Sequence, residues 1–112
     1  MPKITIKEYQ EFTPKTFLVP ESYIDSRLSY LFAGLAAEAG EVAGNYAKFC
    51  REDFGMEELT VRSWKELGDV LYFTFQLANM LGLDIEDILA ANKTKLVDRL
   101  ARNVIKGDGE VR

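Results

Sequence analysis

Apolar residues recur every three or four positions over most of the chain, which is the spacing of one face of an α-helix. The first run predicts a long helix from about Ser22 or Asp25 to Arg51. Its apolar face consists of Leu28, Leu31, Leu35, Ala39, Val42, Tyr46 and Phe49. Residues 3–6 alternate as a strand would, but too briefly to form a sheet. The pattern therefore predicts an all-α domain.

Two further long helices are expected. Gly55 interrupts the pattern, and the second helix ends at Gly82, a residue type that favours the position after a helix. Asp84 is a suitable N-cap for the third helix, which should reach about Ile105. Pro14 and Pro20 limit residues 1–22 to one short helix and extended chain.

The second long helix carries apolar side chains on more than one face, as a helix inside a bundle does. One stripe consists of Trp64, Leu67, Leu71, Ala78 and Leu81, and the other of Val70, Phe73, Leu77 and Met80. We therefore expect a bundle of about four helices per subunit that is completed by oligomerisation. The predicted organisation is a leading segment (1–22), a helical domain (23–105) and a glycine-rich tail (106–112).

Composition and charge narrow the function. The 112 residues fit one domain, and the net charge of −4 argues against nucleic acid or an anionic membrane as the main partner. The absence of histidine excludes Ser-His-Asp and Cys-His catalysis and histidine-bound zinc. The single cysteine excludes an intrachain disulfide, and no segment is apolar enough for a signal peptide or a membrane span. We expect a cytoplasmic protein.

Two pairs of carboxylates lie where charge is costly. Glu38 falls on the apolar stripe of the first long helix among alanines and a glycine, and Glu41 follows one turn later. Glu66 shares a stripe with apolar residues of the second helix, and Asp69 follows one turn later. Unpaired carboxylates beside a core are unfavourable unless they are protonated or bind a cation.

Local explanations exist for the second pair. Arg62 lies four residues before Glu66 and can neutralise it in part, and Ser63 with Glu66 can form a capping box at a helix start. Glu38 has no Lys or Arg three or four positions away. The inner pairs therefore retain both a structural and a functional interpretation at this point.

Helix register favours the functional interpretation. In an antiparallel hairpin, a second helix that begins near Met56 or Glu57 brings the two pairs level, whereas a start at Ser63 does not. We therefore predict that Ser63 lies inside the helix and that four carboxylates face each other. Oxygen ligands favour Mg²⁺, with Mn²⁺ as a substitute, and such a site suits the chemistry of phosphate esters and anhydrides.

Cationic and amide groups suited to phosphates lie on the third helix. Asn92 interrupts its apolar stripe, and Lys95 and Arg99 follow on the same face. Lys48, seven residues after Glu41, points the same way as that carboxylate. These residues are candidate ligands for the distal phosphates of a nucleotide.

Four segments carry a family resemblance: GLAAEAGEV (34–42), KELGDVLYF (65–73), NKTKLVDRLAR (92–102) and KGDGEVR (106–112). The order E-x-x-E, E-x-x-D, N-x-x-K-L resembles that of the MazG-like nucleotide pyrophosphohydrolases, members of the all-α NTP pyrophosphatase superfamily. The resemblance runs from about Tyr9 to the C-terminus. One departure is in the tail, where short members often read G-D-N-R and this chain has Gly-Glu-Val-Arg at 109–112.

The resemblance implies an enzyme that hydrolyses NTP or dNTP to the monophosphate and pyrophosphate with Mg²⁺, as a homodimer or homotetramer. The family's metal ligands match Glu38, Glu41, Glu66 and Asp69; its substrate contacts match Asn92 and Lys95, with Lys48 and Arg99 as further candidates. We hypothesise that water attacks the α-phosphorus and that Glu38 or Glu41 serves as the catalytic base, because the chain has no histidine.

Two alternatives are retained. One is a non-catalytic helical interaction module, such as an adaptor or a toxin-neutralising partner, whose acidic face binds a basic protein. The other is a related pyrophosphatase that acts on dUTP or phosphoribosyl-ATP. The motifs do not distinguish the preferred base or sugar.

Overall fold

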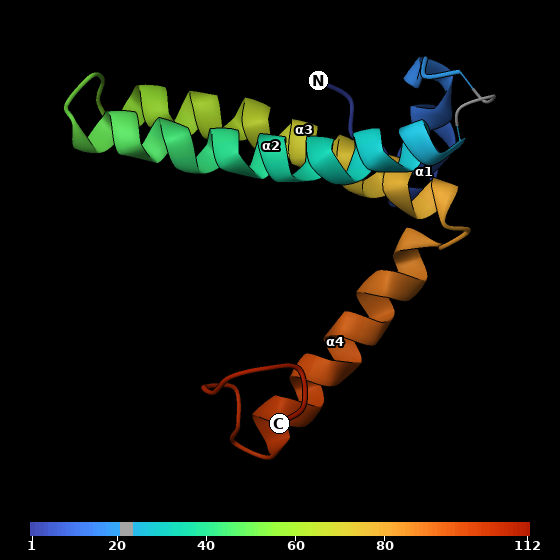
Figure 1. Ribbon diagram of the computed structural model, residues 1–112. Coiled ribbons are helices and arrows are strands. Elements are labelled where there is room, and N and C mark those ends of the chain that lie inside the picture. The colour runs from blue at the N-terminus through green and yellow to red at the C-terminus, as the bar shows by residue number, and fades with distance from the viewer. Residues whose placement is uncertain (21–23) are drawn as a thin grey trace.

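The computed structural model describes residues 1–20 and 24–112 (Figure 1). Its elements are α1 (Ile6–Phe12), the 3₁₀ turn η1 (Thr13–Thr16), α2 (Ile24–Cys50), α3 (Met56–Met80) and α4 (Ile85–Ala101). The described residues contain no strand, so the prediction of an all-α fold with about four helices is confirmed. The boundary predicted at residues 22 and 23 lies outside the described residues.

The ends of α3 agree with the sequence. The helix begins at Met56, so Ser63 lies within it as predicted and does not start a helix. Glu57 in the first turn complements the positive end of the helix dipole. After the helix, Gly82 adopts φ = 71°, a left-handed conformation that glycine adopts without the steric cost of a side chain.

α4 begins as predicted but ends earlier. The Asp84 carboxylate accepts a hydrogen bond of 2.9 Å from the backbone N–H of Glu86. The helix stops at Ala101, short of the predicted end near Ile105, because Asn103 adopts a left-handed φ of 57°. Asparagine is the residue that tolerates this helix-ending conformation best after glycine. The chain can therefore turn back along α4.

α2 and α3 pack side by side as a long antiparallel hairpin (Figure 1). Gly34 lets them approach closely, since a Cβ added there would lie 2.1 Å from the Phe73 ring. The core at this end contains Phe17, Leu31 and Leu77, which are buried. The close approach and this small core hold the hairpin together.

A polar network joins α1 to the corner between α3 and α4. The Gln10 amide donates to Asn79 Oδ1 over 3.0 Å and accepts from the N–H of Ile85 over 3.0 Å. The Thr13 hydroxyl donates to Gln76 Oε1 over 2.8 Å, and both side chains are buried. Since α1 is also the main packing partner of α4, it helps to set the direction in which α4 leaves the hairpin.

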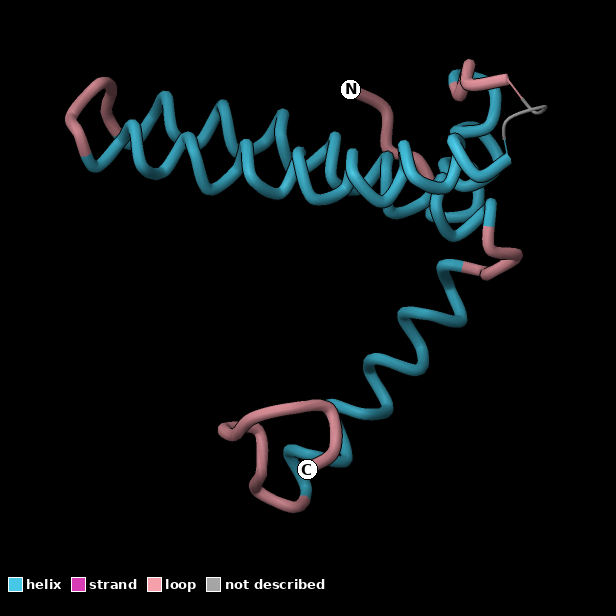
Figure 2. Tube along the Cα trace, in the orientation of Figure 1, coloured by secondary structure: helices cyan, strands magenta, loops and turns pink. Residues whose placement is uncertain are grey.

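The single chain is open rather than compact, and α4 diverges from the hairpin (Figure 2). Its radius of gyration is 17.1 Å, whereas a compact domain of this length has about 13 Å. Its accessible surface is 8489 Å², compared with about 6,200 Å² for a folded monomer of this mass. Exposed apolar side chains on α3 and α4 include Trp64, Leu67, Leu71, Ile88, Leu89, Leu96 and Leu100.

No described helix is both long and apolar enough to cross a membrane.

The contact at Gly34 predicts a stability change. Gly34→Ala should lower the free energy of unfolding by about 1–3 kcal/mol, because the new methyl group forces Phe73 out of its packed position. Gly44→Ala is the matched control, since a Cβ there meets nothing within 4 Å. It should raise the free energy of unfolding by about 0.5–1 kcal/mol through helix propensity. Urea unfolding followed by circular dichroism measures both, and equal effects would contradict the close approach.

Candidate functional site

Three carboxylates meet across the α2–α3 hairpin. Glu38 comes from α2, and Glu66 and Asp69 come from successive turns of α3. One oxygen from each lies within 4.8 Å of the others. We call these three residues the acidic cluster. Because they project from two packed helices, the spacing of their carboxylates follows from the packing of the hairpin.

The repulsion among these carboxylates affects the pKa of Glu38. Its pKa is raised from the ordinary value, first by desolvation and then by the negative charges of Asp69 and Glu66. A hydrogen bond from the protonated Glu38 carboxyl group to Glu66 also raises this pKa, and Glu41 adds a further repulsive charge. The carboxylates of the cluster therefore repel one another within the hairpin.

The basic side chain that could neutralise Glu66 in part is engaged elsewhere. Arg62 donates a hydrogen bond of 3.0 Å to Glu58 and lies 4.3 Å from the centre of the Phe54 ring. Among the residues that the structure describes, no Lys or Arg forms an ion pair with the acidic cluster. Three carboxylates at this spacing without a cationic partner have the donor type and charge that a hard divalent cation requires.

Glu41, the fourth predicted ligand, lies on α2 one turn after Glu38 and is exposed. It does not belong to the group of three whose oxygens lie within 4.8 Å of one another. Its charge nevertheless contributes to the raised pKa of Glu38, so it lies in the same electrostatic environment.

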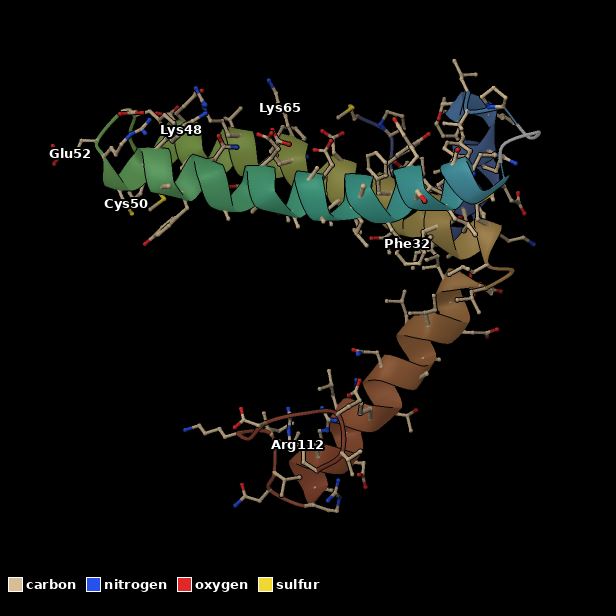
Figure 3. All side chains as sticks on the ribbon, in the orientation of Figure 1. Phe32, Lys48, Cys50, Glu52, Lys65 and Arg112 are labelled. Carbon is tan, nitrogen blue, oxygen red and sulfur yellow. The ribbon has the colours of Figure 1, made fainter. Side chains whose placement is uncertain are left out.

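The candidate phosphate ligands are distributed over both arms of the molecule. Lys48 lies near the turn between α2 and α3, whereas Arg112 and the tail lie on the other arm (Figure 3). On α4, Asn92 is exposed, Lys95 is half-buried and Arg99 is buried. Since α4 diverges from the hairpin, the candidate phosphate-binding residues on α4 do not lie around the acidic cluster of the same chain.

Comparison with known proteins identifies the family. The sequence profile described as "MazG nucleotide pyrophosphohydrolase domain" matches residues 27–103. The chain belongs to this family. The MazG match includes all eight predicted site residues and stops before the tail, where the sequence departs from the pattern of short members.

A relative supports the MazG assignment. The chain is 39% identical over 87 residues to "Gene 37 protein" of Mycobacterium phage L5, and the alignment covers 76% of each protein. No solved structure matches the chain. The activity class of the MazG family, nucleotide pyrophosphohydrolysis, is the one that a paired carboxylate site suits.

Two residues of this MazG-family chain, Asn45 and Glu110, were not predicted from the sequence. Asn45 is buried and accepts a hydrogen bond of 3.4 Å from Arg62 Nη1. It lies seven residues after Glu38, so its position on the same helical face was a usable signal. Glu110 in the tail pairs with Lys95 and Arg99, and no periodicity in a glycine-rich segment indicates such a contact.

The raised pKa of Glu38 predicts a pH-dependent stability. The folded protein holds this proton more tightly than the unfolded chain, so ionisation destabilises the fold as pH rises above the ordinary pKa of 4.5 and through the raised value. In metal-free buffer, Glu38→Gln should therefore unfold at a higher temperature than the parent at pH 7, and the two should converge near pH 4.

Glu57→Gln removes the same charge from an exposed position on α3 and serves as the control. It should not reproduce the gain at pH 7. Thermal unfolding of the three proteins at equal concentration measures the effect, and parallel pH profiles for Glu38→Gln and the parent would contradict it.

Proposed function

We propose that the protein is a Mg²⁺-dependent nucleoside triphosphate pyrophosphohydrolase, which converts NTP or dNTP and water into NMP or dNMP and pyrophosphate. The acidic cluster is the main support, because its oxygens lie within 4.8 Å of one another on a chain of the MazG family. A structural ion-pair network would instead place basic side chains against these carboxylates.

The donor set fits a hard divalent cation. Glu38, Glu66 and Asp69 offer only oxygen, which suits Mg²⁺, with Mn²⁺ as a substitute. Glu41 is proposed as the fourth ligand, since its charge already acts on Glu38. When bound, the ion supplies Lewis-acid stabilisation of the charge that develops on the phosphate oxygens.

The protein side of the reaction requires a base. A water oxygen attacks the α-phosphorus, the bond from that phosphorus to the bridging oxygen breaks, and pyrophosphate leaves. Glu38 or Glu41 accepts the proton of the water, because the chain has no histidine to do so.

We further propose that the working form is a homodimer, either alone or paired as a tetramer. The accessible surface of 8489 Å² exceeds that of a folded monomer of this mass by about 2,000 Å², which is the range buried by obligate subunit interfaces. The exposed apolar faces of α3 and α4 would supply that interface. The adaptor alternative would use an acidic face to bind a basic protein, but it does not require three carboxylate oxygens within 4.8 Å of one another.

In such a dimer, the α4 of one subunit would reach the acidic cluster of the other. This arrangement supplies Asn92, Lys95 and Arg99 to the triphosphate, although the same side chains lie on a diverging arm within one chain. Lys48, on the same helix as Glu38, would approach the phosphates from the other side. Cations here would neutralise the leaving pyrophosphate.

Loss of any one proposed metal ligand should strongly reduce activity. The single variants Glu41→Gln, Glu66→Gln and Asp69→Asn should each lower Mg²⁺-dependent pyrophosphate release by about a hundredfold or more, because each removes a proposed ligand. Release is measured with a panel of NTPs and dNTPs that includes dUTP, with phosphoribosyl-ATP assayed beside them. The panel also separates the general enzyme from its more specialised relatives.

Glu57→Gln is again the matched control and should retain full turnover. Circular dichroism verifies that each variant keeps its helical content. Undiminished turnover in Glu66→Gln and Asp69→Asn would exclude the proposed site.

A subunit-mixing experiment tests the shared site. Asp69→Asn and Lys95→Met chains should each be inactive alone. Their co-refolded mixture should recover about a quarter of the parent activity, because half of the dimers are mixed and each mixed dimer has one intact site. Light scattering records the oligomeric state. No recovery in a mixture that forms dimers would show that each site uses the α4 of its own chain.

A further inference from the structure

The C-terminal tail folds back onto α4 at the two cations that face phosphate in the proposed function. The chain turns at Asn103, and the Arg112 guanidinium donates 3.2 Å hydrogen bonds to the carbonyls of Val104 and Ile105. Arg102 donates to the backbone carbonyl of Arg112. These contacts hold the last residues beside the helix from which they emerge.

One carboxylate of the tail forms ion pairs with both cations at once. Glu110 Oε1 accepts hydrogen bonds from Lys95 Nζ over 2.7 Å and from Arg99 Nη2 over 3.0 Å. Arg99 also donates to the backbone carbonyl of Glu110. The hydrogen bonds from Lys95 and Arg99 lower the pKa of Glu110, so it is ionised at neutral pH. A carboxylate oxygen held by two convergent cations occupies the position that a phosphate oxygen would take.

The two partners differ in how firmly they are placed. The Arg99 side chain is only 6% exposed, whereas the Glu110 side chain is 74% exposed. Lys95 and Arg99 lie on the regular helix α4, whereas Glu110 lies on an irregular segment after it. An exposed carboxylate leaves its partners at little cost, and an incoming anion would take its place at the guanidinium. The tail is therefore the part of this contact that an external anion can displace.

We propose that Glu110 is an internal competitor that blocks the Lys95–Arg99 site until a polyphosphate displaces the tail. The inference rests on the proposed phosphate-binding role of these two residues. Because the glutamate is tethered to the same chain, its effective concentration is high, and it weakens the binding of any ligand that uses the same cations. The tail would thus favour substrates with several phosphate charges over weaker anions.

Calorimetric titration with inorganic tripolyphosphate in EDTA tests the competition without catalysis and without a metal. Glu110→Gln should bind about two- to fivefold more tightly than the parent, which is the range expected for loss of a partly exposed ion pair. Asp108→Asn is the matched control, since it removes the same charge from the same tail at a residue with no described ion pair. It should leave the affinity unchanged. Adding Lys95→Met to Glu110→Gln should remove the gain.

Equal affinities for Glu110→Gln and Asp108→Asn would overturn the proposal, as would a gain that survives Lys95→Met. A parallel hydrolysis assay keeps this test separate from the proposed function. If no nucleotide is hydrolysed but Glu110→Gln still binds tripolyphosphate more tightly, the competition stands and the enzymatic proposal fails. If hydrolysis occurs with the same KM in the parent and Glu110→Gln, the competition is wrong and the enzymatic proposal stands.

Discussion

The close packing of α2 against α3 at Gly34 and Phe73 is the constraint on which the acidic cluster, and the function proposed for it, depend. Two helices held in fixed register bring residues 28 positions apart in sequence, Glu38 and Glu66, to adjacent places on facing surfaces. The repulsion among the carboxylates opposes this packing, and the buried Leu31 and Leu77 on the same two helices offset it. Apolar burial in one part of the hairpin thus offsets carboxylate repulsion in another part, and such a loss of stability is common at functional sites.

The helices and the acidic cluster were largely accessible to sequence reasoning because they depend on local rules. Helical periodicity fixes which residues share a face, and the start of α3 near Met56 follows from the first-turn acids and the interruption at Gly55. Register in an antiparallel hairpin then follows from counting residues from the turn. The same counting placed Ser63 within the helix and Glu66 level with Glu38.

The direction of α4 and the position of the tail were not accessible in this way. The direction of α4 depends on contacts between Gln10 and Asn79, which are 69 residues apart, and no periodic pattern encodes such a pair. The end of α4 depends on a single left-handed residue, Asn103, which a polar helical pattern does not reveal. The pairing of Glu110 with Arg99 follows from that turn, so it was equally hidden.

The bracing of α4 by Gln10 has a mechanical consequence. Gln10 joins both sides of the corner at which α4 starts, and Arg99 lies fourteen residues further along a straight rod of about 21 Å. A rotation of only about 10° at that pivot moves Arg99 by about 4 Å, more than the length of a hydrogen bond. Because α4 is long, the position of Arg99 near its end is sensitive to the hydrogen bonds that the Gln10 amide makes at its start.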